Sequence, residues 1–263
     1  MDLKLNDKLI LVTGSTAGMG KALAKILLQE GAKVIINART EASVDKIWDE
    51  LCEYGAPEKA IGDLATAEGA QAVINAVDAI GELDVLVNNA GIYNAIPFEE
   101  MTDEDWQYMF NVNLMSVVRL SRYYLPRMIR RNSGKILNFS SEVAYKPLPT
   151  FLHYCASKAA ILNLSRGMAE LTKGTRVTVN TILPGPTWTE GTAKYQTEVA
   201  ESKGMTVEEH IEDYFNRFDP TSLVRRFVDS EEVATTVAYY CSELSAATNG
   251  APIRVEGGLI RSI

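Results

Sequence analysis

The fold is decided near the start of the chain by Leu9-Ile10-Leu11-Val12-Thr13-Gly14-Ser15-Thr16-Ala17-Gly18-Met19-Gly20. The apolar run predicts a buried strand, and residues 21–30, with apolar side chains at helical spacing, predict a helix. Glycines between a strand and a helix let the backbone approach a pyrophosphate, which the free N–H groups of the helix can hold. The sequence therefore predicts a dinucleotide site, in the variant spacing Gly-x3-Gly-x-Gly, although a plain tight turn is the alternative. We expect the phosphates to contact Gly14, Ser15, Thr16, Gly18, Met19 and Gly20.

The rest of the chain repeats this alternation of short apolar runs and helical patterns. Further strands are predicted at residues 33–37, 59–62, 85–88, 135–140, 176–183 and 253–256, with helices between them, among them one opening near Tyr154 and one at 231–243. Continuous apolar strands are typical of parallel sheets covered on both faces. We predict one α/β domain over residues 1–263, a doubly wound parallel sheet of about seven strands. Residues 189–226 break the rhythm with two short charged and aromatic helical patterns, which predict a small helical lid over the substrate.

Composition narrows the class of protein. The 263 residues carry a formal charge of −8, which argues against a nucleic acid or an anionic membrane as partner. The N-terminal residues lack the apolar core of a signal peptide, and no stretch reaches membrane-spanning length. The three cysteines are widely spaced without a Cys-x2-Cys pair, so neither a disulfide framework nor a metal site is predicted. We expect a cytoplasmic protein that acts on a small molecule.

The end of the second strand bears on which dinucleotide is bound. An acidic residue there would bind both ribose hydroxyls of NAD and repel a 2′-phosphate. The strand instead runs out as Asn37-Ala38-Arg39-Thr40, and the planar charge of Arg39 suits a phosphate. NADP(H) is therefore the preferred cofactor and NAD(H) remains possible, with a solvated loop cation as the alternative interpretation of Arg39.

Tyr154 and Lys158 are four residues apart in a helical pattern, so both lie on one helix face. A nearby ammonium lowers the pKa of a phenol, which could then donate a proton to a carbonyl and recover one from an alcohol. Such a pair alone is weak evidence, because four-residue pairs commonly just stabilise a helix surface. Ser140 and Ser141, however, end the fifth strand, at the sheet edge where ligands bind. Ser141 is expected to donate to the substrate oxygen, and Ser140 to cap the strand.

With these motifs in order, the chain resembles the short-chain dehydrogenase/reductase family over essentially its whole length. It also carries Asn88-Asn89-Ala90-Gly91, Asn113 within Asn111-Val112-Asn113, and Pro184-Gly185 followed by Thr189. The resemblance implies a catalytic set of Asn113, Ser141, Tyr154 and Lys158, with Asn113 holding a water that links the lysine to solvent. It also implies cofactor contacts for Asp63, Leu64, Asn89, Ala90, Gly91, Tyr154, Lys158, Pro184, Gly185 and Thr189.

The activity implied is the interconversion of a ketone or aldehyde and a secondary alcohol by hydride transfer, in a homotetramer or dimer. The expected pocket wall is Glu142, Val143, His153 and Trp188. A carrier-protein thioester reductase would want a basic surface, and the only dense basic stretch, residues 122–131, reads more simply as a solvated helix face. A sugar or polyol dehydrogenase would suit the polar residues Glu142, His153 and Glu190.

Two other kinds of protein remain as alternatives. A dinucleotide sensor without catalysis is disfavoured because all four catalytic positions are filled. An epimerase, dehydratase or lyase is disfavoured because such chains usually carry a larger C-terminal substrate region than residues 189–226 provide.

Overall fold

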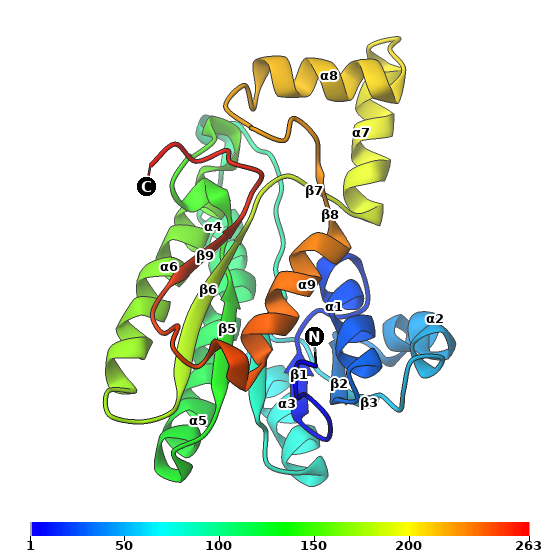
Figure 1. Ribbon diagram of the computed structural model, residues 1–263. Coiled ribbons are helices and arrows are strands. Elements are labelled where there is room, and N and C mark those ends of the chain that lie inside the picture. The colour runs from blue at the N-terminus through cyan, green and yellow to red at the C-terminus, as the bar shows by residue number, and fades with distance from the viewer. Residues whose placement is uncertain (1, 263) are drawn as a thin grey trace.

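The computed structural model describes residues 2–262, so positions 1 and 263 of the predicted domain lie outside the described residues. Its centre is a seven-stranded parallel sheet in the order β3-β2-β1-β4-β5-β6-β9 (Figure 1). The strands are β1 Leu9–Val12, β2 Lys33–Ala38, β3 Glu58–Ile61, β4 Val85–Asn88, β5 Lys135–Phe139, β6 Thr178–Pro184 and β9 Pro252–Val255. The predicted doubly wound parallel sheet is thereby confirmed.

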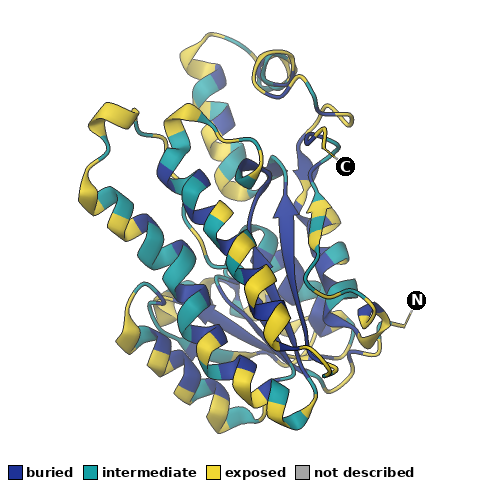
Figure 2. Ribbon diagram, turned by 90° about the vertical axis from the view of Figure 1, so that its left-hand side faces the viewer, coloured by how far each residue is buried: buried dark blue, intermediate teal, exposed yellow. Residues whose placement is uncertain are grey.

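Helices cover both faces of the sheet, because successive residues of a strand point to opposite sides. In β1, Ile10 and Val12 pack with helices α1, α2 and α9, whereas Leu9 and Leu11 pack with α3, α5 and α6. The inner strands β1, β2, β4, β5 and β6 are accordingly almost entirely buried (Figure 2), whereas the edge strands β3 and β9 are largely half-buried or exposed. The helices are α1 Gly18–Gln29, α2 Glu41–Cys52, α3 Ala67–Ile80, α4 Asp103–Phe110, α5 Ser116–Arg131, α6 Leu152–Leu171 and α9 Ser230–Cys241.

The order of the strands reverses beside β1, which pairs with β2 on one side and with β4 on the other. In an open parallel sheet, ligands bind at such a reversal, outside the carboxyl ends of the strands. The glycine turn follows β1 and the Ser140-Ser141 pair follows β5, so both lie at this carboxyl edge. The topology therefore gathers motifs that are more than a hundred residues apart in the sequence.

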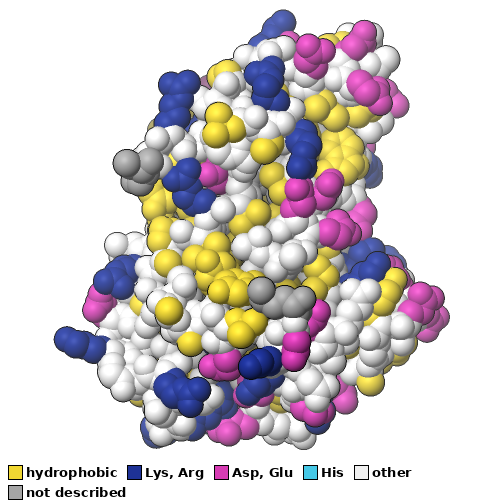
Figure 3. All heavy atoms as spheres, viewed as in Figure 1, with side chains coloured by type: hydrophobic (Ala, Val, Ile, Leu, Met, Phe, Trp, Pro, Cys, Tyr) yellow, Lys and Arg dark blue, Asp and Glu magenta, His cyan; other side chains and the backbone are white. Residues whose placement is uncertain are grey.

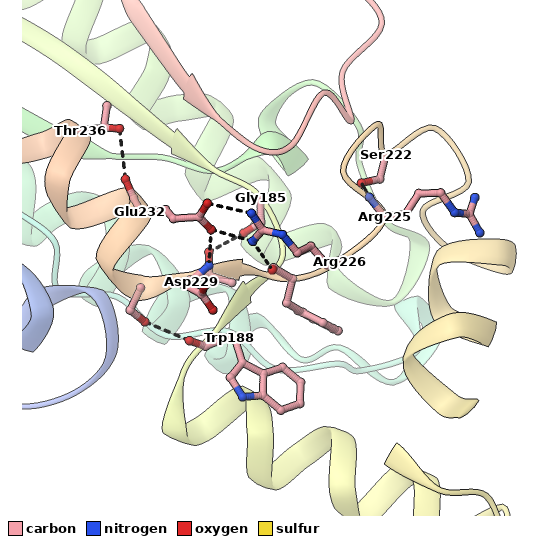
Figure 4. Close-up of polar contacts among 11 residues, drawn as sticks. Gly185, Trp188, Ser222, Arg225, Arg226, Asp229, Glu232 and Thr236 are labelled. Carbon is pink, nitrogen blue, oxygen red and sulfur yellow. Dashed lines mark hydrogen bonds and ion pairs between the residues drawn. The ribbon is translucent and has the colours of Figure 1, made fainter. Parts of the chain in front are cut away.

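The segment between β6 and α9 contains two helices, α7 Glu190–Ser202 and α8 Val207–Arg217, which project beyond the sheet (Figure 1). We call residues 189–227 the insert. Its two ends are joined by short parallel strands, β7 Thr187–Trp188 and β8 Val228–Asp229. Figure 4 shows the base of the insert, where the two terminal guanidinium nitrogens of Arg226 donate hydrogen bonds to the Glu232 carboxylate at 2.7 and 2.8 Å. The predicted pair of short helices is thus present.

An aromatic cluster forms the interior of the insert. Phe215 is only 1% exposed, and the ring of Phe227 lies 5.2 Å from Tyr214 and 5.4 Å from Phe215. Trp188 packs edge-on against Phe227, with the two ring centres 5.2 Å apart. These aromatic side chains therefore form a small core between α8 and the base of the insert, apart from the sheet.

The helices and the surface bear on the kind of partner the protein can have. No helix within residues 2–262 is long and apolar enough to cross a membrane. On the face seen in Figure 3, basic and acidic side chains are interspersed rather than gathered by sign. That face therefore offers no broad basic track of the kind that follows a phosphate backbone.

Candidate active site

The glycine turn after β1 fits tightly against the loop after β4. Gly14 has φ +61°, and a Cβ there would lie 2.9 Å from the Cα of Ala90. A Cβ at Gly20 would lie 2.5 Å from the side-chain nitrogen of Asn89, which donates to the backbone oxygens of Thr13 and Gly14 at 2.9 and 3.1 Å. Any larger residue would push these backbones apart, so the glycines keep the turn close to the sheet edge.

The helix that follows this turn can hold an anion. Ala17, at its N-cap, provides no side-chain hydrogen bond, and its first turn contains no acidic residue. Its N-terminal N–H groups and dipole therefore favour a negative group, as a dinucleotide phosphate requires. One N–H already meets a carboxylate, since Gly18 donates to Glu190 of α7 at 3.0 Å. Glu190 also pairs with Lys21 at 3.1 Å, a link between insert and turn that the sequence did not indicate.

The other residues expected to contact a cofactor lie around the same edge. Arg39 is exposed at the end of β2 and pairs with no carboxylate among residues 2–262. Asp63 accepts from the backbone N–H of Ala65 at 3.0 Å, and Leu64 beside it is buried. A Cβ at Gly185 would lie 2.7 Å from the Cα of Glu256, so Pro184-Gly185 is held against the last strand. Thr189 and Trp188 line a cleft of about 370 Å³ between α1, α7 and α9.

Tyr154 and Lys158 share one face of α6, as their spacing predicts. Lys158 is only 5% exposed, and its Nζ lies 5.7 Å from the centre of the Tyr154 ring. That ammonium donates to the backbone oxygen of Phe139, the last residue of β5, at 2.9 Å. Ser140 donates to the backbone oxygen of Lys158 at 2.7 Å. Ser140 therefore ties α6 to the end of β5.

Asn113 lies in a π-helical turn, Asn111–Met115, between α4 and α5. Its side chain is fully buried, accepts from the N–H of Ile92 at 2.8 Å, and donates toward the oxygens of Ile92 and Ser157 at 3.0 Å each. A Cβ at Gly91 would lie 3.3 Å from the Asn113 oxygen and 3.4 Å from Lys158 Nζ. Asn113 and Lys158 therefore border the same glycine. The sequence around Asn113 shows helical periodicity alone, so the π turn was not predicted.

Charges around Tyr154 differ from the expectation that Lys158 lowers its pKa. Burial, followed by the Glu142 carboxylate, raises the pKa of Tyr154, and the Ser141 hydroxyl opposes this only in part. Burial also lowers the pKa of Lys158 to about 8. Glu142 itself has a pKa raised to about 7, mainly by burial. The protein alone therefore keeps the phenol protonated, which suits a proton donor.

The four expected pocket residues separate into two groups. Glu142 and Val143 form a buried 3-10 turn directly after Ser141, whose hydroxyl donates to the Glu142 carboxylate. The ring of His153 lies 6.1 Å from that of Trp106 in α4, and its Nε2 meets Asn94, in the loop after β4, at 2.9 Å. Trp188 lies at the base of the insert. The structure thus gathers Ser141, Glu142, Tyr154 and Lys158, and places the rings of His153 and Trp188 elsewhere.

Two further contacts at this site had no clear signal in the sequence. Lys146, just after the 3-10 turn, forms an ion pair with the buried Asp219 of the insert and donates to the oxygen of Phe218 at 3.1 Å. The ring of Tyr93 lies 6.1 Å from that of Tyr154. The residues come from segments far apart in the chain, and only the tertiary fold brings them together.

This arrangement places two hydroxyl groups, an ammonium and a carboxylate beside an anion-binding turn. Hydroxyls of Ser141 and Tyr154 can hold and protonate a substrate oxygen, and the glycine turn can hold a dinucleotide. Such a set is suited to carbonyl and alcohol chemistry with a bound cofactor.

Comparison with known proteins identifies relatives along the full chain. A family model described as short chain dehydrogenase matches residues 8–200. The uncharacterized oxidoreductase YvrD of Bacillus subtilis (strain 168) is 51% identical over 263 residues, covering 100% of both chains. The 3-oxoacyl-[acyl-carrier-protein] reductase FabG of Vibrio cholerae is 32% identical, covering 98% of this chain and 99% of the relative.

A solved structure agrees with these relatives. L-sorbose reductase from Gluconobacter frateurii, complexed with NADPH and L-sorbose, superposes with a TM-score of 0.93 at 30% identity and full coverage of both chains. The match extends through the insert as well as the sheet. The chain therefore belongs to the short-chain dehydrogenase/reductase family of oxidoreductases.

Proposed function

We propose that the protein is an NADP(H)-dependent oxidoreductase that interconverts a ketone or aldehyde and a secondary alcohol, with Tyr154 as its acid and base. The observation that carries this proposal is the gathering of Ser141, Tyr154 and Lys158 at the carboxyl edge of the sheet, beside the glycine turn. When bound, the nicotinamide supplies or accepts the hydride, and the protein's contribution is orientation and proton transfer.

Each residue has a distinct task in this proposal. Ser141 and Tyr154 hold the substrate oxygen, and Tyr154 donates the proton to a carbonyl, because its raised pKa keeps it protonated. Lys158 provides a positive charge near the phenol and would bind ribose hydroxyls of the cofactor. Asn113, beside Gly91 and Lys158, would hold the water that links the lysine to solvent.

Replacing Tyr154 with Phe tests the proposed acid. The variant removes one hydroxyl, so NADPH-dependent ketone reduction should fall by about 10²–10⁴-fold. NADPH binding, followed by fluorescence titration, should remain. Tyr145→Phe is the matched control, because Tyr145 is 47% exposed in the same segment. Turnover retained in Tyr154→Phe contradicts the mechanism, and a wild type that reduces no ketone in a broad panel favours a dinucleotide sensor.

The preference for NADP(H) is supported by Arg39 and by the NADPH reported in the complex of L-sorbose reductase. An exposed guanidinium at the end of β2 can pair with a 2′-phosphate. Arg39→Ala should therefore weaken NADPH binding at least about tenfold, the equivalent of one charged contact. NADH binding should not change, and exposed Arg130→Ala serves as control. Preference of the wild type for NADH contradicts this assignment.

For the substrate, we favour a ketose and its polyol over a carrier-bound thioester. L-sorbose reductase, whose reported complex contains a ketose, matches this chain over the full length of both chains, including the insert. The basic residues of α5 lie near its C-terminal end, which leads into the start of β5 and away from the candidate site. We expect reduction of L-sorbose or D-fructose with a higher kcat/KM than an acetoacetyl thioester, and the reverse ranking overturns this choice.

A further inference from the structure

Glu142 occupies an unusual place for a carboxylic acid. It is only 9% exposed, and it directly follows Ser141, which caps the 3-10 turn that contains Glu142. The Ser141 hydroxyl donates its hydrogen to the Glu142 carboxylate while its oxygen accepts from the N–H of Val143 at 3.4 Å. Both the hydrogen and the oxygen of the serine hydroxyl therefore form hydrogen bonds within the turn.

A serine hydroxyl has a single hydrogen to donate. While that hydrogen points to the Glu142 carboxylate, it cannot point to the oxygen of a substrate. If Glu142 is protonated instead, its own O–H can donate to the Ser141 oxygen, and the serine hydrogen becomes free to turn outward. No bond other than these hydrogen bonds changes, and the proton on Glu142 is exchanged with solvent.

We propose that Glu142 is a positioning residue that controls the direction of the Ser141 hydroxyl, so that carbonyl reduction proceeds through the protonated form of Glu142. This inference rests on the proposed function, because it assumes that Ser141 holds the substrate oxygen. Glu142 itself need not contact the reacting atoms and acts through the serine.

The surroundings of Glu142 allow this switch near neutral pH. On α6 it faces Tyr154, Cys155 and Lys158; on the loop after its own turn it faces Lys146; and on the insert it faces Tyr214 and Asp219. Burial and the negative charge of Asp219 favour the neutral acid, whereas Ser141 and Lys146 favour the carboxylate. Since Lys146 already forms an ion pair with Asp219, its charge is largely committed. The balance leaves the pKa of Glu142 at about 7.

The test is the pH profile of kcat/KM for L-sorbose reduction with NADPH. With Glu142 at a pKa near 7 and Lys158 at a pKa near 8 both required in their protonated forms, wild-type kcat/KM should fall about fivefold between pH 6 and pH 7.5. Glu142→Gln cannot ionise and its amide can still donate to Ser141, so it should stay active. Its decline over the same range should be only about 1.3-fold, the share expected from Lys158 with a pKa near 8.

Three controls separate this role from a structural one. Glu170→Gln makes the same substitution on the exposed side of α6 and should keep the wild-type profile. Glu142→Asp should keep a pH-dependent decline with a displaced midpoint. The residual activity of Ser141→Ala should show no decline attributable to Glu142, because the serine transmits the effect.

The outcomes are distinct. An unchanged fivefold decline in Glu142→Gln overturns the inference, even if Tyr154→Phe is inactive and the proposed function stands. Turnover retained in Tyr154→Phe overturns the proposed function instead. Should Glu142→Gln not fold, carbon-13 NMR of the wild-type protein with labelled glutamate still decides: a buried glutamate titrating near pH 7 supports the inference, and the absence of any glutamate midpoint above pH 6 contradicts it.

Discussion

The amide of Asn113 joins three separate parts of the chain. It pairs with both backbone polar groups of Ile92 in the loop after β4 and with Ser157 on α6, and it is fully buried. A buried polar group that loses its partner costs about 1–3 kcal/mol. The side chain therefore fixes the position of this loop relative to α6, whatever further part it has in proton transfer.

Replacing Asn113 with Leu, which has the same number and branching of side-chain heavy atoms, tests this anchoring role. The N–H and oxygen of Ile92 would lose their partners, so the free energy of unfolding should fall by about 2–4 kcal/mol. Urea unfolding followed by circular dichroism measures the change. Asn75→Leu, at an exposed position of α3, should change stability by less than about 0.5 kcal/mol. Equal effects of the two substitutions contradict the role of Asn113.

Glu142 should also make stability depend on pH. Its pKa rises from an ordinary 4.5 to about 7 on folding, so the folded state binds more protons than the unfolded state between these values. The protein therefore loses stability as pH rises from 4.5 through 7. Since one pKa unit corresponds to about 1.4 kcal/mol, the full loss is about 3 kcal/mol.

Glu142→Gln removes this titration and should gain stability over the wild type as pH rises. The difference in free energy of unfolding between variant and wild type should grow by about 1–3 kcal/mol from pH 5 to pH 8. Urea unfolding at both pH values measures it. A difference that stays constant would mean that Glu142 ionises normally in the folded protein.

At the scale of the element, the strands were predictable because buried parallel strands are continuous apolar runs. The predicted and observed boundaries differ by a few residues. Helix α1, for example, begins at Gly18 rather than at Lys21, because tertiary contacts override the poor helix propensity of two glycines. The π turn at Asn111–Met115 and the two-residue strands β7 and β8 could not be predicted, because such short elements leave no periodic pattern.

Glu190, the first residue of α7, links the insert to the glycine turn. It accepts from Gly18 and pairs with Lys21, whose pKa is raised by this carboxylate and by Glu50 against the effect of burial. Glu190 is more than half exposed as a side chain, so the pair contributes little to global stability. Its expected effect is local, on how firmly the first turn of α7 is held against α1.

Glu190→Gln should therefore loosen α7 without unfolding the protein. Amide hydrogen exchange within residues 190–202 should become severalfold faster, while exchange in the sheet should stay unchanged. Glu198→Gln, which affects only an exposed pair with Lys194 on the same helix, is the matched control. Identical exchange in the two variants would mean that Glu190 does not anchor the insert.

At the scale of the whole molecule, the sequence could predict the position of the site because its motifs follow strand ends, and the topology brings those ends to one edge. It could not predict which pocket candidates converge. His153 is the neighbour of Tyr154, yet their side chains leave α6 in different directions. Asp219 comes near Glu142 and pairs with Lys146 only because the insert folds back over the 3-10 turn. Such contacts depend on packing between distant segments.

Self-association is the prediction that belongs to the complete chain. The family resemblance implies that the helices bearing Asn113 and Tyr154 pair between subunits. Large apolar side chains are exposed near the first of them, with Phe98 62% and Tyr108 50% exposed. Burying such side chains stabilises an interface by about 25 cal/mol per Å² of apolar area, before the cost of association.

We therefore expect the protein to sediment at four times its chain mass of 28.9 kDa, or at twice that mass if only one interface forms. The double substitution Phe98→Glu and Tyr108→Glu should lower that mass, because charges in an apolar interface lose their hydration. Leu244→Glu, at a position 40% exposed after α9, should leave the mass unchanged. A wild-type protein that sediments as a single chain at every concentration rules out this assembly. If only the control variant dissociates, the contact lies on a different face from that of α4.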